Sequence, residues 1–373
     1  MADAQRGGTP ERLKGKRVCI CVGAGGVGKT TTAAALALGL AARGAKVAVV
    51  TIDPAPRLAS ALGLKTLGGE PARVDTAELA GAGIEMAGEL WAMRLDPKRT
   101  LDDLVSRLAA DRRAREEILA NPIYRELSSA VAGAQELGAV AKLYELRHEG
   151  DFDVIVLDTP PARNAVDFLD APARLLGFLE GRALKVFLAP GGAAARVLGR
   201  STGLAFAIFA RVTGVDMLGD LSRFFRALGG VIDAFGERTR RVAALLRDRS
   251  TTFMLITSPE PAPAREAALL AERLDAAGMG RCGMIVNRVH HGLDGRAPAE
   301  VRAVLAPAVG ERLAARAAAN LADFDALARR DRETIARLCD TVSEPEPLLV
   351  PYLDQDIADL RGLARVAGCL FAS

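Results

Sequence analysis

Residues 18–30 read VCICVGAGGVGKT, an apolar run that passes directly into a glycine-rich turn. The alanine-rich stretch up to Gly44 predicts a helix that begins near Lys29 and ends at that glycine. The turn has the spacing G-x-x-x-x-G-K-[ST] and lies between a predicted strand and a predicted helix. In that position its glycines let consecutive backbone N–H groups turn inward, beside the positive end of the helix. The stretch therefore predicts a phosphate-binding loop, and a glycine-rich turn without a ligand is the alternative.

The expected phosphate contacts come from the loop and the first turn of its helix. Lys29 supplies a charge for the β- and γ-phosphates of a nucleotide, and the hydroxyl of Thr30 is an oxygen ligand of the kind that Mg²⁺ prefers. The candidate nucleotide-binding residues are Gly23, Gly25, Gly26, Val27, Gly28, Lys29, Thr30 and Thr31.

Further apolar runs predict the rest of the sheet. They do not alternate with polar residues and are separated by helical stretches, which is typical of a doubly wound, mostly parallel α/β sheet buried on both faces. The runs are Lys46–Ile52, Leu90–Leu95, Val154–Leu157, Lys185–Leu188, Phe253–Ile256 and Met284–Val286. The proline-rich segments 259–263 and 345–351 are expected to be ordered loops.

Two stretches, at about 98–148 and 171–248, hold a helical pattern and little or no strand pattern. We interpret them as one α-helical subdomain inserted into a P-loop domain that covers residues 16–373. Residues 1–15 are expected to be a flexible leader.

Composition excludes several classes of protein. Half of the 373 residues are apolar, which excludes a disordered chain, and five cysteines over this length indicate reduced thiols rather than a disulfide scaffold. A net charge of +3 with 4% aromatic residues argues against a nucleic-acid partner. No apolar run reaches the length of a membrane span, and the N-terminus lacks the pattern of a secretory signal, so we expect a cytoplasmic protein.

Two aspartates end predicted strands. Asp53 follows the second strand and Asp158 follows the run 154–157, and the carboxyl ends of strands are where open α/β sheets bind ligands. We expect Asp53 to orient or deprotonate the attacking water, with Lys29 as the second catalytic residue, and Asp158 to hold Mg²⁺ together with Thr30. The alternative is that both aspartates only initiate turns.

Several segments, taken in order, resemble the ArsA/Get3 family of ATPases, the single-unit branch of the SIMIBI P-loop ATPases. They are the phosphate loop, TIDPAPRLASALGL (51–64), LWAMRLDP (90–97), VIVLDTPPARNAVDFL (154–169), TSPEPAPAREAALLAERL (257–274), MIVNRV (284–289) and LLVPYLDQDIADLRGL (348–363). The resemblance implies a dimeric ATPase that uses ATP and Mg²⁺, with Asp53 in switch I and Asp158 in switch II. It also implies that Asn287 contacts the adenine and that Pro351 and Tyr352 close over its other side. The inserted helices would take up a hydrophobic or membrane-protein client; the alternative is that their apolar stripe packs inside the subdomain.

The sequence departs from this family at Ala24, where the family has a lysine that reaches the partner subunit's phosphates. Arg57 or Arg163 would replace that cation, a related ATPase in a heterodimer would supply it, or hydrolysis would be slow. The choice between a homodimer and a heterodimer stays open.

Other residues argue against alternative kinds of site. Cys19 and Cys21 lie on one face of a buried strand and are expected to pack, and no C-x-x-C pair is present for an interface zinc ion. Arsenite as a substrate is disfavoured, since a soft metalloid needs several convergent thiolates. For His290 and His291, as for the other isolated histidine, surface or capping roles suffice.

The sequence therefore predicts a Mg²⁺-dependent ATPase that switches a dimer to handle a hydrophobic client or to regulate a partner, peripheral to the membrane only through its partners. One alternative is a nucleotide-gated interaction module with weak hydrolysis, whose mark would be Ala24. Another is a ParA/MinD-like positioning ATPase, which often ends in a membrane-seeking helix. The C-terminal helix expected here is amphipathic only over a short stretch.

Overall fold

The computed structural model describes residues 8–53, 55–109, 111–122, 124–125, 134–159, 177, 232–292 and 297–372. The chain divides into two compact units, the first formed by residues 1–94, 151–165 and 248–373 and the second by residues 95–150 and 166–247. The strands of the first unit are β1 (Val18–Val22), β2 (Lys46–Thr51), β3 (Ala72–Arg73), β4 (Glu89–Arg94), β5 (Val154–Asp158), β6 (Thr251–Thr257), β7 (Arg281–Val289) and β8 (Leu348–Pro351). Its helices are α1 (Thr9–Arg12), α2 (Lys29–Ala42), α3 (Arg57–Ala61), α4 (Thr76–Gly81), α15 (Pro261–Ala276), α16 (Pro298–Val309), α17 (Glu311–Val342) and α18 (Leu360–Phe371).

The eight strands form one sheet in the order β3-β4-β2-β5-β1-β6-β7-β8. All neighbouring pairs are parallel except β3 with β4. Every residue of β1, β5 and β6 is buried, which explains why these runs do not alternate between apolar and polar residues. The doubly wound, mostly parallel α/β sheet expected from the sequence is confirmed.

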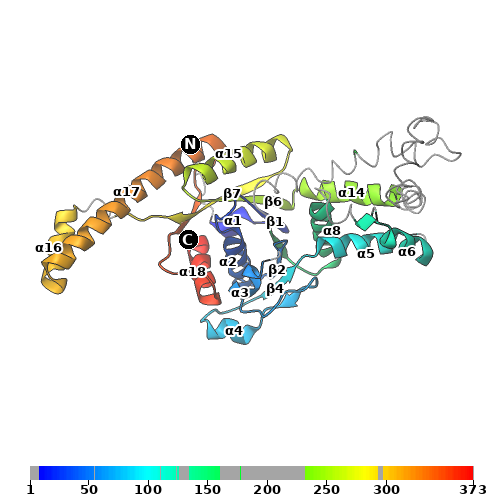
Figure 1. The fold of residues 1–373 in the computed structure, drawn as a ribbon, viewed down its shortest axis with the longest axis horizontal. Helices are drawn as coiled ribbons and strands as arrows, with labels where there is room; N and C mark the ends of the chain where they lie inside the picture. Colours follow the sequence, from blue (N-terminus) through cyan, green and yellow to red (C-terminus); the bar gives the residue numbers. More distant parts are fainter. Residues whose placement is uncertain are drawn as a thin grey trace, which may run out of the picture. The chain divides into compact units, whose positions relative to one another are not determined.

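The chain leaves β1 toward one edge of the sheet and β6 toward the other. Right-handed crossovers then place the connecting helices on opposite faces, and Figure 1 shows α2 and α15 on the two sides of the strands. The point where the strand order reverses lies beside β1, at the carboxyl ends of β1, β2 and β5. Ligands of open α/β sheets bind at such a point.

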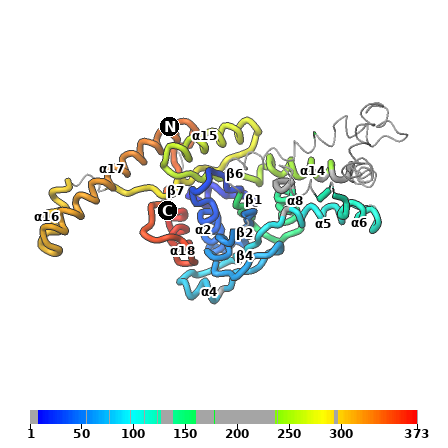
Figure 2. The backbone as a smooth tube through the Cα atoms, viewed as in Figure 1, coloured from blue at the N-terminus to red at the C-terminus, as the bar shows by residue number. Residues whose placement is uncertain are grey.

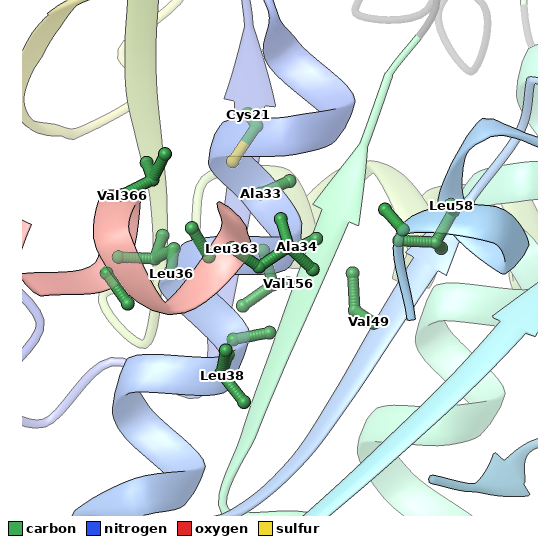
Figure 3. Packing of buried hydrophobic residues seen from close by; sticks show 14 of the residues in the cluster. Cys21, Ala33, Ala34, Leu36, Leu38, Val49, Leu58, Val156, Leu363 and Val366 are labelled. Carbon is green, nitrogen blue, oxygen red and sulfur yellow. The ribbon is translucent and has the colours of Figure 1, made fainter. Parts of the chain in front are cut away.

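Helix α2 is the centre of the hydrophobic core. Its alanine and leucine side chains pack between the sheet and the C-terminal helix α18, and Figure 3 shows Leu36 and Leu38 of α2, Val156 of β5 and Leu363 of α18 in one cluster. A Cβ atom at Gly39 would lie 2.2 Å from the Phe371 ring, so this glycine permits the close approach of the two helices. The apolar face of α18 is therefore buried against α2.

A long helical hairpin, α16 and α17, leaves the sheet after β7 and returns the chain to β8 (Figures 1 and 2). Gly310, with φ of 81°, forms the turn between the two helices. At about 1.5 Å per residue, the 32 residues of α17 span about 48 Å. Helix α16 has no buried residue, whereas α17 buries Ala328, Asp331 and Thr334 in its C-terminal half.

Two loop predictions need correction. The segment 345–351 contains β8, and helix α15 begins at Pro261 within the segment 259–263. Proline is tolerated at the first position of a helix and at the end of a short edge strand, since neither position needs its missing N–H donor. The hairpin α16–α17 carries a helical pattern that our sequence interpretation did not assign.

The described part of the second unit is helical: α5 (Pro97–Leu108), α6 (Arg112–Ala120), α8 (Ala134–Glu149) and α14 (Ile232–Leu246). The expected strand 185–188, Arg163 and most of the insertion 171–248 lie outside the described residues. Part of the expected leader, residues 1–15, is structured: α1 lies within it, and Thr9 and Leu13 are buried. The inserted subdomain and its boundaries stay predictions. Within the described residues, no helix is both long enough and apolar enough to cross a bilayer.

Candidate nucleotide-binding site

The glycines of the phosphate loop are required by close backbone approaches and left-handed conformations. A Cβ atom at Gly23 would lie 1.9 Å from the backbone oxygen of Ile256 at the end of β6. Gly26 and Gly28 have φ of 78° and 89°, a region that L side chains rarely adopt. A Cβ atom at Gly28 would also meet the amide nitrogen of Asn287 at 2.4 Å. The loop is thus held between the ends of β6 and β7.

Helix α2 begins at Lys29, immediately after the loop. Gly28 is its N-cap and no side chain caps the helix there, so the first-turn N–H groups are available for an anion. Lys29 is buried and its Nζ donates to the Ala24 backbone oxygen at 2.7 Å. Burial lowers the pKa of Lys29, and the nearby Asp158 carboxylate opposes that shift. The lysine charge is therefore held inside the loop, beside an acid.

Asp158 lies between two hydroxyl groups at the carboxyl ends of three adjacent strands. The strand register places it beside Cys21 of β1 and Thr51 of β2. Its Oδ2 accepts from Thr30 Oγ1 at 2.7 Å and from Thr51 Oγ1 at 2.9 Å. Burial raises the pKa of Asp158 to about 6, although the hydrogen bonds from both threonines and the charge of Lys29 lower it. Thr51 was not singled out in the sequence, although it ends the same apolar strand that precedes Asp53.

The other oxygen of this carboxylate makes the site suitable for a cation. Asp158 Oδ1 is buried and has no hydrogen-bond partner among the described residues. A buried acceptor without a partner costs free energy, which a bound cation would recover. The neighbouring donors are a carboxylate and a hydroxyl, the hard oxygen ligands that Mg²⁺ prefers. The residues therefore fit a Mg²⁺ ion held by Thr30 and Asp158.

Asp53 lies in the loop after β2, where it forms a turn and lines the cavity; its role toward an attacking water stays a prediction. Its Oδ1 accepts from the Ala55 backbone N–H at 2.9 Å, which forms a turn. Its Oδ2 lies 4.0 Å from a guanidinium nitrogen of Arg57. Both side chains line the same cavity as Lys29 and Thr30. The turn thus uses one carboxylate oxygen, and the other lies near the Arg57 guanidinium.

The cavity has a volume of ≈ 830 Å³, within the range of pockets that bind small molecules. One end of the cavity, here called the phosphate end, is lined by the phosphate loop, the start of α2 and Asp53, and Asp158 is hydrogen-bonded to Thr30 there. The base end consists of Asn287, Arg288, Pro351 and Tyr352. Gly26, Gly28 and Thr31 line the first end, and all four residues of the second line the cavity. The structure therefore brings most of the sequence-predicted residues to one cavity, although Gly23, Gly25, Val27 and Asp158 are not among those that line it.

Asn287 is almost fully buried and its amide is already engaged. Its Nδ2 donates to the Val27 backbone oxygen at 2.8 Å, and its Oδ1 accepts from the Arg288 backbone N–H at 2.9 Å. The side chain thus ties the end of β7 to the phosphate loop. Contact between this amide and an adenine ring stays a prediction.

Of the two arginines proposed to replace the missing lysine, one is among the described residues. Arg57 reaches the cavity with its side chain 74% exposed. Arg163 lies outside the described residues. Ala24 itself is buried, and its side chain belongs to the hydrophobic core cluster. In this conformation the side chain of residue 24 therefore packs in the hydrophobic core.

One sequence interpretation was wrong. His290 has neither a surface nor a capping role, because its imidazole pairs with the buried carboxylate of Asp331, 41 residues away, at 2.7 Å. The pair joins α17 to the end of β7, and no local spacing in the sequence indicates it. Only the tertiary fold brings the two side chains together.

Comparison with known proteins identifies the family. The sequence profile of the anion-transporting ATPases, the ArsA type, matches residues 16–295, which is well over half of the chain. The chain belongs to this family. Among curated proteins, it is 32% identical over 154 residues to a putative arsenical pump-driving ATPase of Halobacterium salinarum. That match covers 40% of this chain and 23% of the relative, so it spans less than a quarter of that protein.

The ArsA family match agrees with the resemblance recognised in the sequence. It includes the phosphate loop, Asp53, Asp158 and Asn287, and it ends shortly before α16. The hairpin α16–α17, strand β8 with Tyr352, and α18 lie beyond the matched residues.

Proposed function

We propose that the chain is a Mg²⁺-dependent ATPase whose nucleotide lies in the ≈ 830 Å³ cavity, with phosphates at the phosphate end and adenine at the base end. One observation carries the proposal: Lys29, Thr30 and Asp158 meet at the phosphate loop, and the carboxylate keeps one buried oxygen without a partner. A turn without a ligand would not need a buried acid and a buried lysine beside it. Membership of the ArsA family supports the same reaction.

The residues divide the work of phosphoryl transfer. Lys29 and the N-terminus of α2 stabilise the negative charge on the phosphates, and Thr30 with Asp158 holds the metal ion. Bound Mg²⁺ would neutralise charge that develops between the β- and γ-phosphates. Asp53, through the oxygen that its turn leaves available, orients the attacking water. Phosphoryl transfer depends mainly on such positioning and charge stabilisation.

Asp53→Asn is a sharp test, because the new amide oxygen keeps the turn with Ala55 and removes only the charge and basicity. We expect ATP affinity to change less than threefold and turnover to fall about 100-fold or more. Lys29→Ala should instead weaken ATP binding itself by about 100-fold. The control is Asp151→Asn. Asp151 is fully exposed and precedes the start of β5, whereas Asp158 is at the end of that strand. Steady-state hydrolysis and titration with a fluorescent ATP analogue measure both quantities, and unchanged turnover in Asp53→Asn would refute the assigned role.

A dimer that works on a hydrophobic client is the finer part of the proposal. It is supported by the single phosphate loop of a chain in this family. Because Ala24 carries no cation, we propose that Arg57 or a related ATPase in a heterodimer supplies the missing charge. Light scattering of the purified chain, with and without ATP, reports whether two copies of this chain form a dimer without a second protein.

The positioning ATPase is less well supported than this proposal. Its membrane-seeking helix would need an apolar face, and the six buried positions of α18 are used against the core: Leu360, Leu363, Val366, Ala367, Leu370 and Phe371. The interaction module with weak hydrolysis differs from the main proposal only in rate. A turnover measurement on the unmodified chain separates the two.

A further inference from the structure

His290, Asp331 and Tyr352 form a contact chain behind the base end of the cavity. His290 follows the last residue of β7, Tyr352 follows β8, and Asp331 lies on α17. The backbone N–H of His290 and its Nδ1 both contact Asp331 Oδ2, at 3.0 Å and 2.7 Å. The imidazole stacks on the Tyr352 ring with centroids 5.2 Å apart and planes 12° apart. One imidazole therefore joins a buried acid to an aromatic ring that lines the cavity.

Asp331 holds the imidazole in one orientation. Its side chain is fully buried and its second oxygen pairs with Arg330 at 3.0 Å. Burial favours the protonated carboxyl, but the hydrogen bonds from His290 and Arg330 outweigh it and lower the pKa of Asp331. An ionised carboxylate only accepts hydrogen bonds, so Nδ1 of His290 must be the donor. Asp331 of α17 thereby fixes the orientation of the imidazole that stacks on Tyr352.

The Tyr352 ring is placed for stacking with a ligand. Its backbone N–H donates to the Val289 oxygen at 2.9 Å, which keeps it against the end of β7. The residue is 56% exposed and lines the cavity beside Asn287 and Arg288. Arg288 has φ of 61°, a left-handed conformation that is costly for a residue with a side chain. Strained backbone of this kind persists where its surroundings hold it, and here His290 anchors the next turn of the chain to α17.

We propose that His290 is a positioning residue that fixes the Tyr352 ring as a stacking surface for a purine base. We further infer that Asp331 links occupancy of this surface to α17 and thereby to the α16–α17 hairpin. The inference rests on the proposed nucleotide function and adds base recognition and a path of regulation to it. Tyr352 would contact the base, whereas His290 and Asp331 would act through Tyr352.

Two substitutions at His290 separate the stacking from the ion pair. His290→Gln keeps a donor for Asp331 and loses the ring, so ATP affinity should fall about threefold to tenfold. His290→Phe keeps a ring beside Tyr352 and loses the Nδ1 donor, so it should retain more of the affinity. Inorganic tripolyphosphate, which has no base, should bind both variants as it binds the wild type. His291→Ala is the matched control, because His291 is the exposed neighbour.

Hydrogen exchange of residues 324–334 tests the link to α17. We expect ATP to slow exchange there in the wild type more than tripolyphosphate does, and His290→Phe and Asp331→Asn to lose that difference. Both His290 variants change a residue that is partly exposed, so they keep the test available if Asp331→Asn fails to fold.

The outcomes separate this inference from the proposed function. Equal loss of ATP and tripolyphosphate affinity would show a general structural role and would overturn the inference. So would variants that match His291→Ala in both measurements while the wild type binds and hydrolyses ATP. A wild-type chain that binds neither compound would instead refute the proposed function, and the inference with it.

Discussion

At the phosphate end of the cavity, the polar contacts join the centre of the sheet to one loop: Asp158 of β5 binds Thr30 at the start of α2 and Thr51 of β2. At the base end, β7 and β8 lie at the edge of the sheet, and a helix that leaves the sheet supplies the fixed point, Asp331. At the first end the charged pair Lys29 and Asp158 is buried, whereas the second end includes the exposed ring of Tyr352. The difference teaches that the proposed phosphate site rests on contacts at the centre of the sheet, whereas the proposed base site rests on packing at its edge.

The largest effect is expected from Gly23→Ala at the phosphate end. The added Cβ would lie 1.9 Å from a backbone oxygen of β6, which cannot move without disturbing the sheet. We expect a loss of about 3 kcal/mol or more in the free energy of unfolding, or no folded protein. Gly26→Ala is the matched control in the same loop, because its Cβ would meet nothing within 4 Å and only its φ of 78° is unfavourable. It should cost about 1 kcal/mol. Urea denaturation measures both, and equal losses would contradict the steric argument.

A smaller effect, on pH dependence, is expected from Asp158→Asn. Since burial raises the pKa of Asp158 to about 6, the folded chain binds its proton more tightly than the unfolded chain, where a value of about 3.9 is usual. The resulting stabilisation is complete below about pH 4 and is lost as the pH rises through 6. The stability of the wild type relative to Asp158→Asn, without nucleotide, should therefore fall by about 2–3 kcal/mol between pH 4 and pH 7.

Urea denaturation at several pH values checks this prediction, with Asp151→Asn as a control for the loss of one exposed carboxylate. If the difference in unfolding free energy between the wild type and Asp158→Asn does not change with pH, burying the charged carboxylate costs no free energy in the nucleotide-free protein.

The smallest effect is expected at the base end, from Tyr352→Ala. Loss of the exposed ring should reduce ATP affinity about threefold to tenfold and leave the affinity for tripolyphosphate unchanged. Leu349→Ala is the control, because Leu349 is an exposed residue of β8, the strand that precedes Tyr352, and does not line the cavity. Fluorescence titration with both ligands measures the effect. If the affinity for tripolyphosphate falls as well, the two ends of the cavity are not independent and the comparison above must be revised.

Much of the fold was predictable because its strands are buried on both faces. The runs that became β1, β2, β4, β5, β6 and β7 are uninterrupted apolar segments separated by helical stretches. Strands β3 and β8 were missed because two residues at one edge and a short proline-ended run at the other carry no such pattern. The hairpin α16–α17 was missed although its sequence has a helical pattern, and only the structure shows that α16 buries none of its residues while α17 buries seven side chains.

The residues of the candidate site were likewise predicted where a local sequence pattern marks them and missed where it does not. Lys29, Thr30, Asp53 and Asp158 were found because each follows a strand or belongs to one loop with a fixed spacing. Thr51 was missed although it is two residues from Asp53, since its role depends on the register between β2 and β5. His290 was misjudged because its partner lies 41 residues away on another helix.

The sequence by itself determined the phosphate loop, its strand and its helix, because eight consecutive residues contain both the backbone freedom and the charge that a phosphate needs. Only the tertiary structure decided that Asn287 ties β7 to that loop and that an imidazole connects α17 to the base end. Such contacts depend on which strands are neighbours and on where a helix outside the sheet returns. A spacing along the chain does not encode either property.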